Sequence, residues 1–419
     1  MRGLVLHPDI RARRRGRDPE AALAEAVSLA GALSLDIIDS RVVALARAHP
    51  GMLFGKGKLD EIGAFIRDND IGLVLVDGPV SPIQQRNLEK RWQVKLLDRT
   101  GLILEIFAER AATREGVLQV ELAALSYQRT RLVRSWTHLE RQRGGLGFVG
   151  GPGETQIESD RRAIDEAIHR LKKQLSRITR TRGLHRAARR KVPYPIVALV
   201  GYTNAGKSTL FNRLTGAGVM VRDMLFATLD PTMRLVTLPS GREVILSDTV
   251  GFISDLPTEL VAAFRATLEE VLDADLILHL RDITHPETEA QAADVRAILE
   301  TLGIGEERRE AMIEVWNKID RADAESRQVL ERIAARAERV RIVSAGTGEG
   351  VAGLLETVDA ALAPPSFRAR LHLGFAEGRK RAWLFDQSVV EAESQTEDGF
   401  DLRVNWTRRQ AEQFRRLSG

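Results

Sequence analysis

The feature that most constrains this chain is an eight-residue glycine loop between a predicted strand and a predicted helix. Residues 201–208 read GYTNAGKS, which has the GxxxxGK[ST] spacing of a phosphate-binding loop. An apolar run at residues 196–200 precedes the loop, and TLFNRL at residues 209–214 reads as the start of a helix. This order brings inward-facing backbone N–H groups and a helix N-terminus to one point, which predicts a polyphosphate site.

The residues of the loop divide the expected chemistry among them. The glycines let the backbone turn its N–H groups inward, Lys207 supplies a cation, and Ser208 supplies a hydroxyl for Mg²⁺. The alternative is a plain glycine turn between a strand and a helix, which the flanking pattern makes the weaker interpretation. We expect nucleotide contacts at Gly201, Tyr202, Thr203, Asn204, Ala205, Gly206, Lys207, Ser208 and Thr209.

Two further strings follow in the order that a nucleotide switch requires. FATLD at residues 226–230 carries a threonine, and DTVG at residues 248–251 ends a predicted strand. Asp248 can hold the water shell of Mg²⁺, and Gly251 leaves its amide free to approach a γ-phosphate. DxxG alone is a weak signal, but behind a phosphate loop it is a strong one. The expected contacts are Phe226, Ala227, Thr228, Leu229, Asp230, Asp248, Thr249, Val250 and Gly251.

A base-recognition string, NKID at residues 317–320, follows a predicted buried strand. Asp320 presents two acceptor oxygens to the N1–H and exocyclic amino protons of guanine, which adenine cannot match. Asn317 would tie this string to the phosphate loop, the Lys318 stem would lie against the base, and the amides of residues 344–345 would face guanine O6. NKxD could also be a turn after a strand. The expected contacts are Asn317, Lys318, Ile319, Asp320, Ser344, Ala345 and Gly346.

The pattern of the chain changes along its length, and 419 residues exceed what one hydrophobic core usually supports. Residues 1–110 alternate strands with helices, which predicts an α/β domain with a mostly parallel sheet. Residues 111–191 predict a long antiparallel helical hairpin. Residues 192–363 hold the nucleotide motifs on a mostly parallel sheet with helices on both faces. Residues 364–419 read as a small βαββα module. The predicted fold class is therefore a multidomain α/β protein.

The hairpin is the expected nucleic-acid contact. Long helical periodicity runs over residues 101–133 and 155–184, and a glycine-rich loop at residues 144–153 joins the two stretches. Basic residues are dense around this loop, with Trp136 and Phe148 interleaved. The alternative is an ordinary solvated helix face.

Composition excludes several classes of protein. The absence of cysteine removes disulfides, thiolate catalysis and cysteine-ligated zinc. No apolar run approaches a membrane span, and the N-terminus has no signal core, so we expect a cytoplasmic protein. The net charge is only +4, so a basic surface must be local. GKGK at residues 55–58 lacks the full phosphate-loop spacing and is interpreted as a basic turn before a helix.

The ordered motifs, together with DRTGLILEIF at residues 98–107 and GGPGETQIESDRR at residues 150–162, resemble the HflX family of translational GTPases over most of residues 1–362. The resemblance implies a relative of the Obg proteins that hydrolyses GTP with Mg²⁺ and binds the large (50S) ribosomal subunit and its rRNA. Some members are implicated in splitting stalled ribosomes. By motif, Ser208 and Thr228 would ligate Mg²⁺, residues 226–230 would form the γ-phosphate switch, and the catalytic residues would be Lys207, Thr228 and Gly251.

Three positions refine these expectations. Many members of the family carry a Thr-Arg pair before Gly-Pro-Gly, where residues 147–153 read GFVGGPG. Phe252 stands where Ras-like enzymes carry a water-orienting glutamine, which predicts slow unassisted hydrolysis. Asn204 stands where several potassium-activated GTPases place a K⁺-coordinating asparagine, with a loop-stabilising side chain as the alternative.

Two other functions stay open on the sequence. One is an RNA remodelling factor that uses ATP as well as GTP through the same phosphate loop. The other is a binding module whose GTP site only reports the nucleotide state. We expect a monomer, although the sequence does not reveal whether the chain dimerises.

Overall fold

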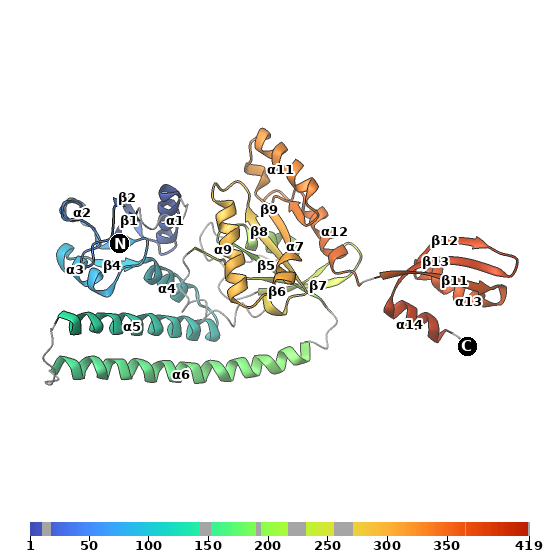
Figure 1. The fold of residues 1–419 in the computed structure, drawn as a ribbon, viewed down its shortest axis with the longest axis horizontal. Helices are drawn as coiled ribbons and strands as arrows, with labels where there is room; N and C mark the ends of the chain where they lie inside the picture. Colours follow the sequence, from blue (N-terminus) through green and yellow to red (C-terminus); the bar gives the residue numbers. More distant parts are fainter. Residues whose placement is uncertain are drawn as a thin grey trace. The chain divides into compact units, whose positions relative to one another are not determined.

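The structure is a computed structural model in which the chain forms two compact units, Met1–Val358 and Asp359–Gly419. It confirms the predicted fold class, with a parallel N-terminal sheet, a long helical pair, a phosphate-loop sheet and a small C-terminal α+β module (Figure 1). The finer division into four domains stays a prediction. The residues that the structure describes are 1–10, 18–142, 152–189, 194–216, 232–254, 271–364 and 366–417.

A four-stranded sheet, in the order β2-β1-β3-β4 with every neighbouring pair parallel, begins the chain. The elements are β1 (Arg2–Ile10), α1 (Pro19–Gly31), β2 (Asp36–Leu45), α2 (Lys56–Asp68), β3 (Leu73–Val76), α3 (Pro82–Trp92), β4 (Lys95–Asp98) and α4 (Arg99–Arg110). Successive strand residues point to opposite faces, so Leu73 and Leu75 pack with α1 and α4, whereas Val74 and Val76 pack with α2 and α3. The core on the α1 and α4 side continues into the core of the nucleotide-binding sheet.

The helical pair follows, and one prediction about it was wrong. The stretch predicted as one helix over residues 101–133 is two helices, because α4 ends at Arg110 and α5 (Arg114–Gln142) begins after a break. Thr113 makes the new start, since its Oγ1 accepts a hydrogen bond of 3.0 Å from the Gly116 N–H. The second helix, α6 (Pro152–Arg189), lies alongside α5 (Figure 1). Of the predicted tip loop, residues 144–151 lie outside the described residues.

The nucleotide motifs lie on a six-stranded sheet of order β10-β9-β8-β5-β7-β6, in which only β6 runs antiparallel to its neighbour. The two central strands, β5 and β8, are almost completely buried. The elements are β5 (Ile196–Gly201), α7 (Lys207–Thr215), β6 (Thr232–Thr237), β7 (Glu243–Asp248), β8 (Leu276–Asp282), α9 (Thr288–Thr301), α10 (Glu306–Glu310), β9 (Ile313–Asn317), α11 (Ala324–Arg336), β10 (Val340–Ile342) and α12 (Val351–Ala361). The carboxyl ends of β5, β7 and β9 therefore bring three motifs to one edge of the sheet.

The C-terminal unit has the predicted βαββα order. Its elements are β11 (Ser366–Gly374), α13 (Gly378–Asp386), β12 (Val390–Gln395), β13 (Gly399–Thr407) and α14 (Arg408–Arg416). The strands form an antiparallel sheet of order β11-β13-β12. Leu402, Val404 and Trp406 of β13 pack with Leu384 and Phe414 from the helices, so one face of this small sheet forms its core.

Candidate active site

The predicted phosphate loop connects β5 to α7. Gly206 has a φ of +93°, and a Cβ added there would lie 2.2 Å from Nδ2 of Asn317, so this position requires glycine. Lys207 is the first residue of α7, and its Nζ donates to the carbonyl oxygens of Gly201 at 3.1 Å and Tyr202 at 2.8 Å. Burial lowers the pKa of Lys207 to about 8, although the carboxylate of Asp248 opposes that shift. The lysine is thus held inside the loop, where a polyphosphate would meet it.

The residues present fit a magnesium ion. Ser208 Oγ donates to Oδ2 of the buried Asp248 at 2.9 Å, so a hydroxyl and a carboxylate adjoin each other beside the phosphate loop. Mg²⁺ prefers such oxygens and usually keeps several waters and substrate phosphates as its other ligands. When bound, the ion would neutralise charge that develops on the phosphates. The other predicted ligand, Thr228, lies outside the described residues, as do Phe226, Ala227, Leu229 and Asp230.

The DxxG segment lies directly against the phosphate loop. Phe252 N–H donates to the Gly201 carbonyl at 3.1 Å, and Thr203 N–H donates to the Phe252 carbonyl at 2.7 Å. A Cβ added at Gly251 would lie 2.8 Å from Cγ2 of Thr203 and 3.2 Å from Nζ of Lys207, so only glycine permits this approach. The ring of Phe252 is 2% exposed and packs in the core. The side chain that replaces the water-orienting glutamine is therefore directed away from solvent.

The base-recognition string is linked to the phosphate loop as the sequence predicts. Asn317 ends β9, its Nδ2 donates to the Ala205 carbonyl, and its Oδ1 accepts from the Ala345 N–H, both at 2.8 Å. Lys318 has a φ of +67°, and its Nζ pairs with Asp282 at 2.7 Å. Asp320 is exposed in the short 3₁₀ turn that follows.

The two amides expected to face guanine O6, those of Ser344 and Ala345, already donate to protein groups in the structure. Ser344 N–H donates to the Glu349 carbonyl at 2.9 Å, and Ala345 N–H donates to Asn317. A base oxygen would compete for these donors, so the assignment of Ser344, Ala345 and Gly346 to guanine stays a prediction.

Sequence reasoning missed Arg213 and did not predict where the side chain of Tyr202 lies. Arg213 of α7 donates from Nε to the Ala345 carbonyl at 2.6 Å and from Nη2 to the Gly346 carbonyl. It thereby fixes the loop at residues 344–346, whose amides are expected to face the base. A basic residue on a helix gives no signal for such a role. The phenol of Tyr202 is buried, although the phosphate-loop pattern leaves that position free.

Comparisons with known proteins agree with this geometry. Four family models match successive parts of the chain: "GTP-binding GTPase N-terminal" at residues 20–108, "GTP-binding GTPase Middle Region" at 110–189, "50S ribosome-binding GTPase" at 196–318 and "HflX C-terminal domain" at 328–419. GTPase HflX of Magnetococcus marinus is 53% identical over 373 residues, which cover 88% of this chain and 84% of that protein. This chain belongs to the HflX family.

Other HflX relatives match at similar extent. GTPase HflX of Escherichia coli K12 is 43% identical over 373 residues, covering 89% of this chain and 86% of that protein. Putative GTP-binding protein 6 of Xenopus laevis is 34% identical over 407 residues, covering 95% and 76%. Together with the phosphate-loop sheet, HflX membership makes this chain a GTP-binding P-loop GTPase. Within the described part of the chain, no helix is both long enough and apolar enough to cross a bilayer.

Proposed function

We propose that this GTPase is a molecular switch that binds the 50S ribosomal subunit and dissociates or rescues stalled ribosomes. The observation that carries the proposal is the match of residues 196–318 to the family described as "50S ribosome-binding GTPase". The Mg²⁺-assisted chemistry would use the residues assigned above, with Lys207 and Gly251 at the phosphates. The cytoplasmic location and the monomeric state belong to this proposal.

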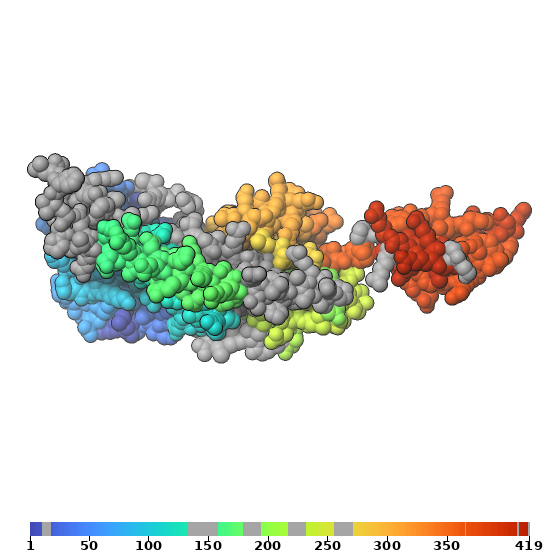
Figure 2. All heavy atoms as spheres, turned by 90° about the horizontal axis from the view of Figure 1, so that it is seen from below, coloured from blue at the N-terminus to red at the C-terminus, as the bar shows by residue number. Residues whose placement is uncertain are grey.

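The exposed side of α6 supports a contact with RNA. Arg170, Lys173 and Arg177 recur at i, i+3 and i+7, so they share one side of the helix, and all three are exposed. The middle of α6 is visible in green on the face shown in Figure 2. Positive charges in a row along one side of a helix would attract RNA phosphates, and such contacts would make binding steeply salt-dependent.

The glycine tip gives the sharpest test of the proposal. Deleting residues 145–151 should leave GTP affinity nearly unchanged and abolish both ribosome-stimulated hydrolysis and subunit splitting, because these glycines would let the backbone enter a narrow RNA cleft. Phe148 could stack there on an unpaired base, an interaction worth about 1 to 3 kcal/mol. Co-sedimentation with 50S subunits in GDP and in a GTP analogue measures the binding. Normal 50S affinity with full stimulation in the deletion variant would place the ribosome-binding surface elsewhere.

Charge variants of α6 provide a matched comparison. The pair Arg170→Gln and Lys173→Gln should weaken 50S binding and lower its salt slope by about one unit for each phosphate that the variant no longer neutralises. The pair Arg332→Gln and Arg336→Gln removes the same charge from exposed positions of α11 and should leave 50S binding unchanged. Equal effects of the two pairs would mean that only net charge matters.

The alternatives are separated by two assays. An RNA remodelling factor that uses ATP predicts that ATP and ADP compete with labelled GTP, whereas Asp320 favours guanine. A binding module that only reports nucleotide state predicts no change in turnover when 50S subunits are added.

A potassium site at Asn204 is a further part of this proposal. Asn204 is exposed with a φ of +59°, a left-handed conformation that asparagine tolerates better than most residues. The residue type therefore has a structural explanation as well as a cation-binding one. Asn204→Gly separates the two, because glycine keeps the backbone and removes the side chain. A K⁺ ligand predicts faster hydrolysis in KCl than in NaCl for the native protein and equal rates for the variant.

A further inference from the structure

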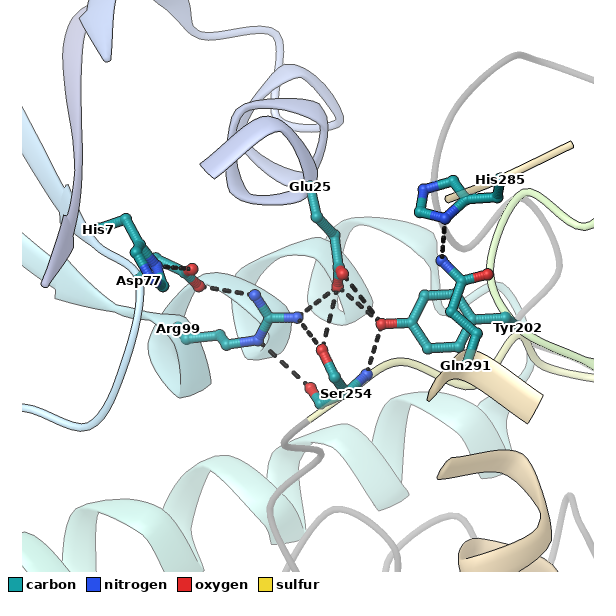
Figure 3. Close-up of polar contacts among 8 residues, drawn as sticks. All are labelled: His7, Glu25, Asp77, Arg99, Tyr202, Ser254, His285 and Gln291. Carbon is teal, nitrogen blue, oxygen red and sulfur yellow. Dashed lines mark hydrogen bonds and ion pairs between the residues drawn. The ribbon is translucent and has the colours of Figure 1, made fainter. Parts of the chain in front are cut away.

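A buried polar cluster joins the N-terminal sheet to the nucleotide loops. Its members, here called the Arg99 cluster, are Glu25, Asp77, Arg99, Tyr202 and Ser254 (Figure 3). Glu25 lies on α1, Asp77 directly follows β3, and Arg99 is the first residue of α4. Tyr202 belongs to the phosphate loop, and Ser254 lies three residues beyond Gly251. The cluster thus joins the N-terminal sheet and its helices to the loops of the nucleotide-binding sheet, and all five residues belong to the first compact unit.

Arg99 is the centre of the cluster and is 7% exposed. Its Nη1 donates to Asp77 at 2.6 Å, and its Nη2 donates to Glu25 and to Ser254 Oγ, the latter at 2.9 Å. Its Nε donates to the Ser254 carbonyl at 3.3 Å. Burial alone would lower the pKa of Arg99, but the carboxylates of Asp77 and Glu25 raise it above its ordinary value. The guanidinium therefore stays charged, and a buried charge is tolerated only while such partners are in place.

Tyr202 connects the cluster to the phosphate loop. Its phenol donates to the Glu25 carboxylate, with Oη 3.0 Å from both carboxylate oxygens, and accepts from the Ser254 N–H at 2.8 Å. Its own backbone carbonyl accepts from Lys207 Nζ at 2.8 Å. Burial, with the charge of Glu25, raises the pKa of Tyr202 to about 12, so the hydroxyl is a neutral donor near pH 7. Phosphate loops bind phosphates through backbone groups, so nucleotide binding does not by itself require this phenol.

Ser254 is held at its N–H, its carbonyl and its hydroxyl by groups of this cluster. Only two residues separate it from Gly251, so the position of the Gly251 amide depends on where Ser254 is fixed. We propose that Glu25 and Arg99 are positioning residues for GTP hydrolysis, acting through Tyr202 and Ser254 to hold Gly251 against the phosphate loop. The inference rests on the proposed role of Gly251 at the γ-phosphate and does not depend on ribosome binding.

Such an arrangement affects turnover because the donors that stabilise a transition state work best when they are already in place. Reciprocity holds for binding free energies, so a transition-state analogue such as GDP with aluminium fluoride, whose affinity follows kcat, should stabilise α1 and α4 more than GDP alone does. Anything that moves the N-terminal sheet would then change hydrolysis through this cluster.

The test uses conservative changes in the full-length protein. Tyr202→Phe and Glu25→Gln should each lower kcat by about tenfold or more, while the affinities for fluorescent GTP and GDP analogues stay within about twofold. The double variant should be no slower than the slower single variant, because both changes act on the contact between Tyr202 and Glu25, which Tyr202→Phe removes and Glu25→Gln weakens by taking away the carboxylate charge. Tyr194→Phe and Glu20→Gln, a tyrosine and a glutamate outside the cluster, are the matched controls and should keep the native kcat.

Three outcomes would overturn the proposal: a native kcat in folded Tyr202→Phe and Glu25→Gln, additive decreases in the double variant, or equal decreases in the controls. If these variants do not fold, hydrogen exchange of residues 19–31 and 99–110 in the native protein replaces them. Protection there should be higher in the complex with GDP and aluminium fluoride than in the GDP complex, and identical protection would refute the coupling. Gly251→Ala separately tests the assignment beneath the proposal, since unchanged hydrolysis in that variant would remove Gly251 from the γ-phosphate.

Discussion

Replacing Asn317 should remove the hydrogen bonds that link the base-recognition string at residues 317–320 to the phosphate loop and to Ala345. The side chain is 1% exposed, and Asn317→Ala removes both of its 2.8 Å hydrogen bonds. The groups left behind, the Ala205 carbonyl and the Ala345 N–H, belong to residues that are themselves buried. Each buried group left without a partner costs about 1 to 3 kcal/mol, so the free energy of unfolding should fall by about 2 to 6 kcal/mol in total.

Two measurements and one control make this prediction specific. Urea denaturation gives the loss of stability, and titration with a fluorescent GTP analogue gives the loss of affinity, which should exceed tenfold, a change of about 1.4 kcal/mol. Asn69→Ala is the control, because Asn69 donates a single 3.0 Å hydrogen bond to the Phe65 carbonyl at the end of α2. It should lose about 1 kcal/mol of stability and no GTP affinity. If Asn317→Ala loses no more stability than Asn69→Ala and binds GTP normally, the link does not organise the site.

Three further predictions concern single side chains on the nucleotide-binding sheet or in the segments that follow its strands. Asp320→Asn replaces an acceptor by a donor and should weaken GTP relative to xanthosine triphosphate by about a hundredfold, or 2 to 3 kcal/mol; unchanged GTP affinity would contradict the assignment. Phe252→Gln places an amide in the core and should lower the free energy of unfolding by about 3 kcal/mol or more, and native stability in the variant would contradict this. Because Phe252 cannot orient a water molecule, the purified native protein should hydrolyse GTP slowly without a partner, and rapid unassisted turnover would contradict that expectation. Burial holds the pKa of His279 on β8 below its ordinary value of 6.5. Below pH 6.5 the unfolded state therefore binds a proton that the folded state does not, and the free energy of unfolding should fall. Urea denaturation at pH 7.5 and 5.5 should show a weaker pH dependence for His279→Leu than for the native protein, and an equal pH dependence would exclude this histidine as the cause.

The sequence predicted most of the fold because its signals are local. Strands, helices and the order of the nucleotide motifs follow from hydrophobic period and turn chemistry within short windows. The break between α4 and α5 was missed because residues 111–113 contain neither glycine nor proline. There the helix start depends on a threonine cap, and the end of α4 depends on packing against α1 and the sheet.

The Arg99 cluster lay beyond sequence reasoning for a different reason. Its hydrogen bonds join residues 155 apart in the chain for Arg99 and Ser254, and 177 apart for Glu25 and Tyr202. No periodicity or spacing rule relates positions at such distances. The string at residues 98–107 carries part of the family resemblance, but nothing in it indicates that Arg99 reaches a loop of the nucleotide-binding sheet.

The core shared between the two sheets of the first unit determines what truncation can reveal. Leu23 and Phe107 belong to the same buried cluster as Val200, Phe252 and residues further along the chain. A fragment that begins at residue 192 would expose to water the apolar side chains that pack against α1 and α4 in the full chain. This exposure would cost about 25 cal/mol of stability for each Å² of apolar surface. A loss of solubility or of nucleotide binding in that fragment would then reflect the newly exposed apolar surface, not a loss of regulation by the N-terminal sheet. Point substitutions in an intact chain are therefore the sound route to any regulatory role of the N-terminal sheet.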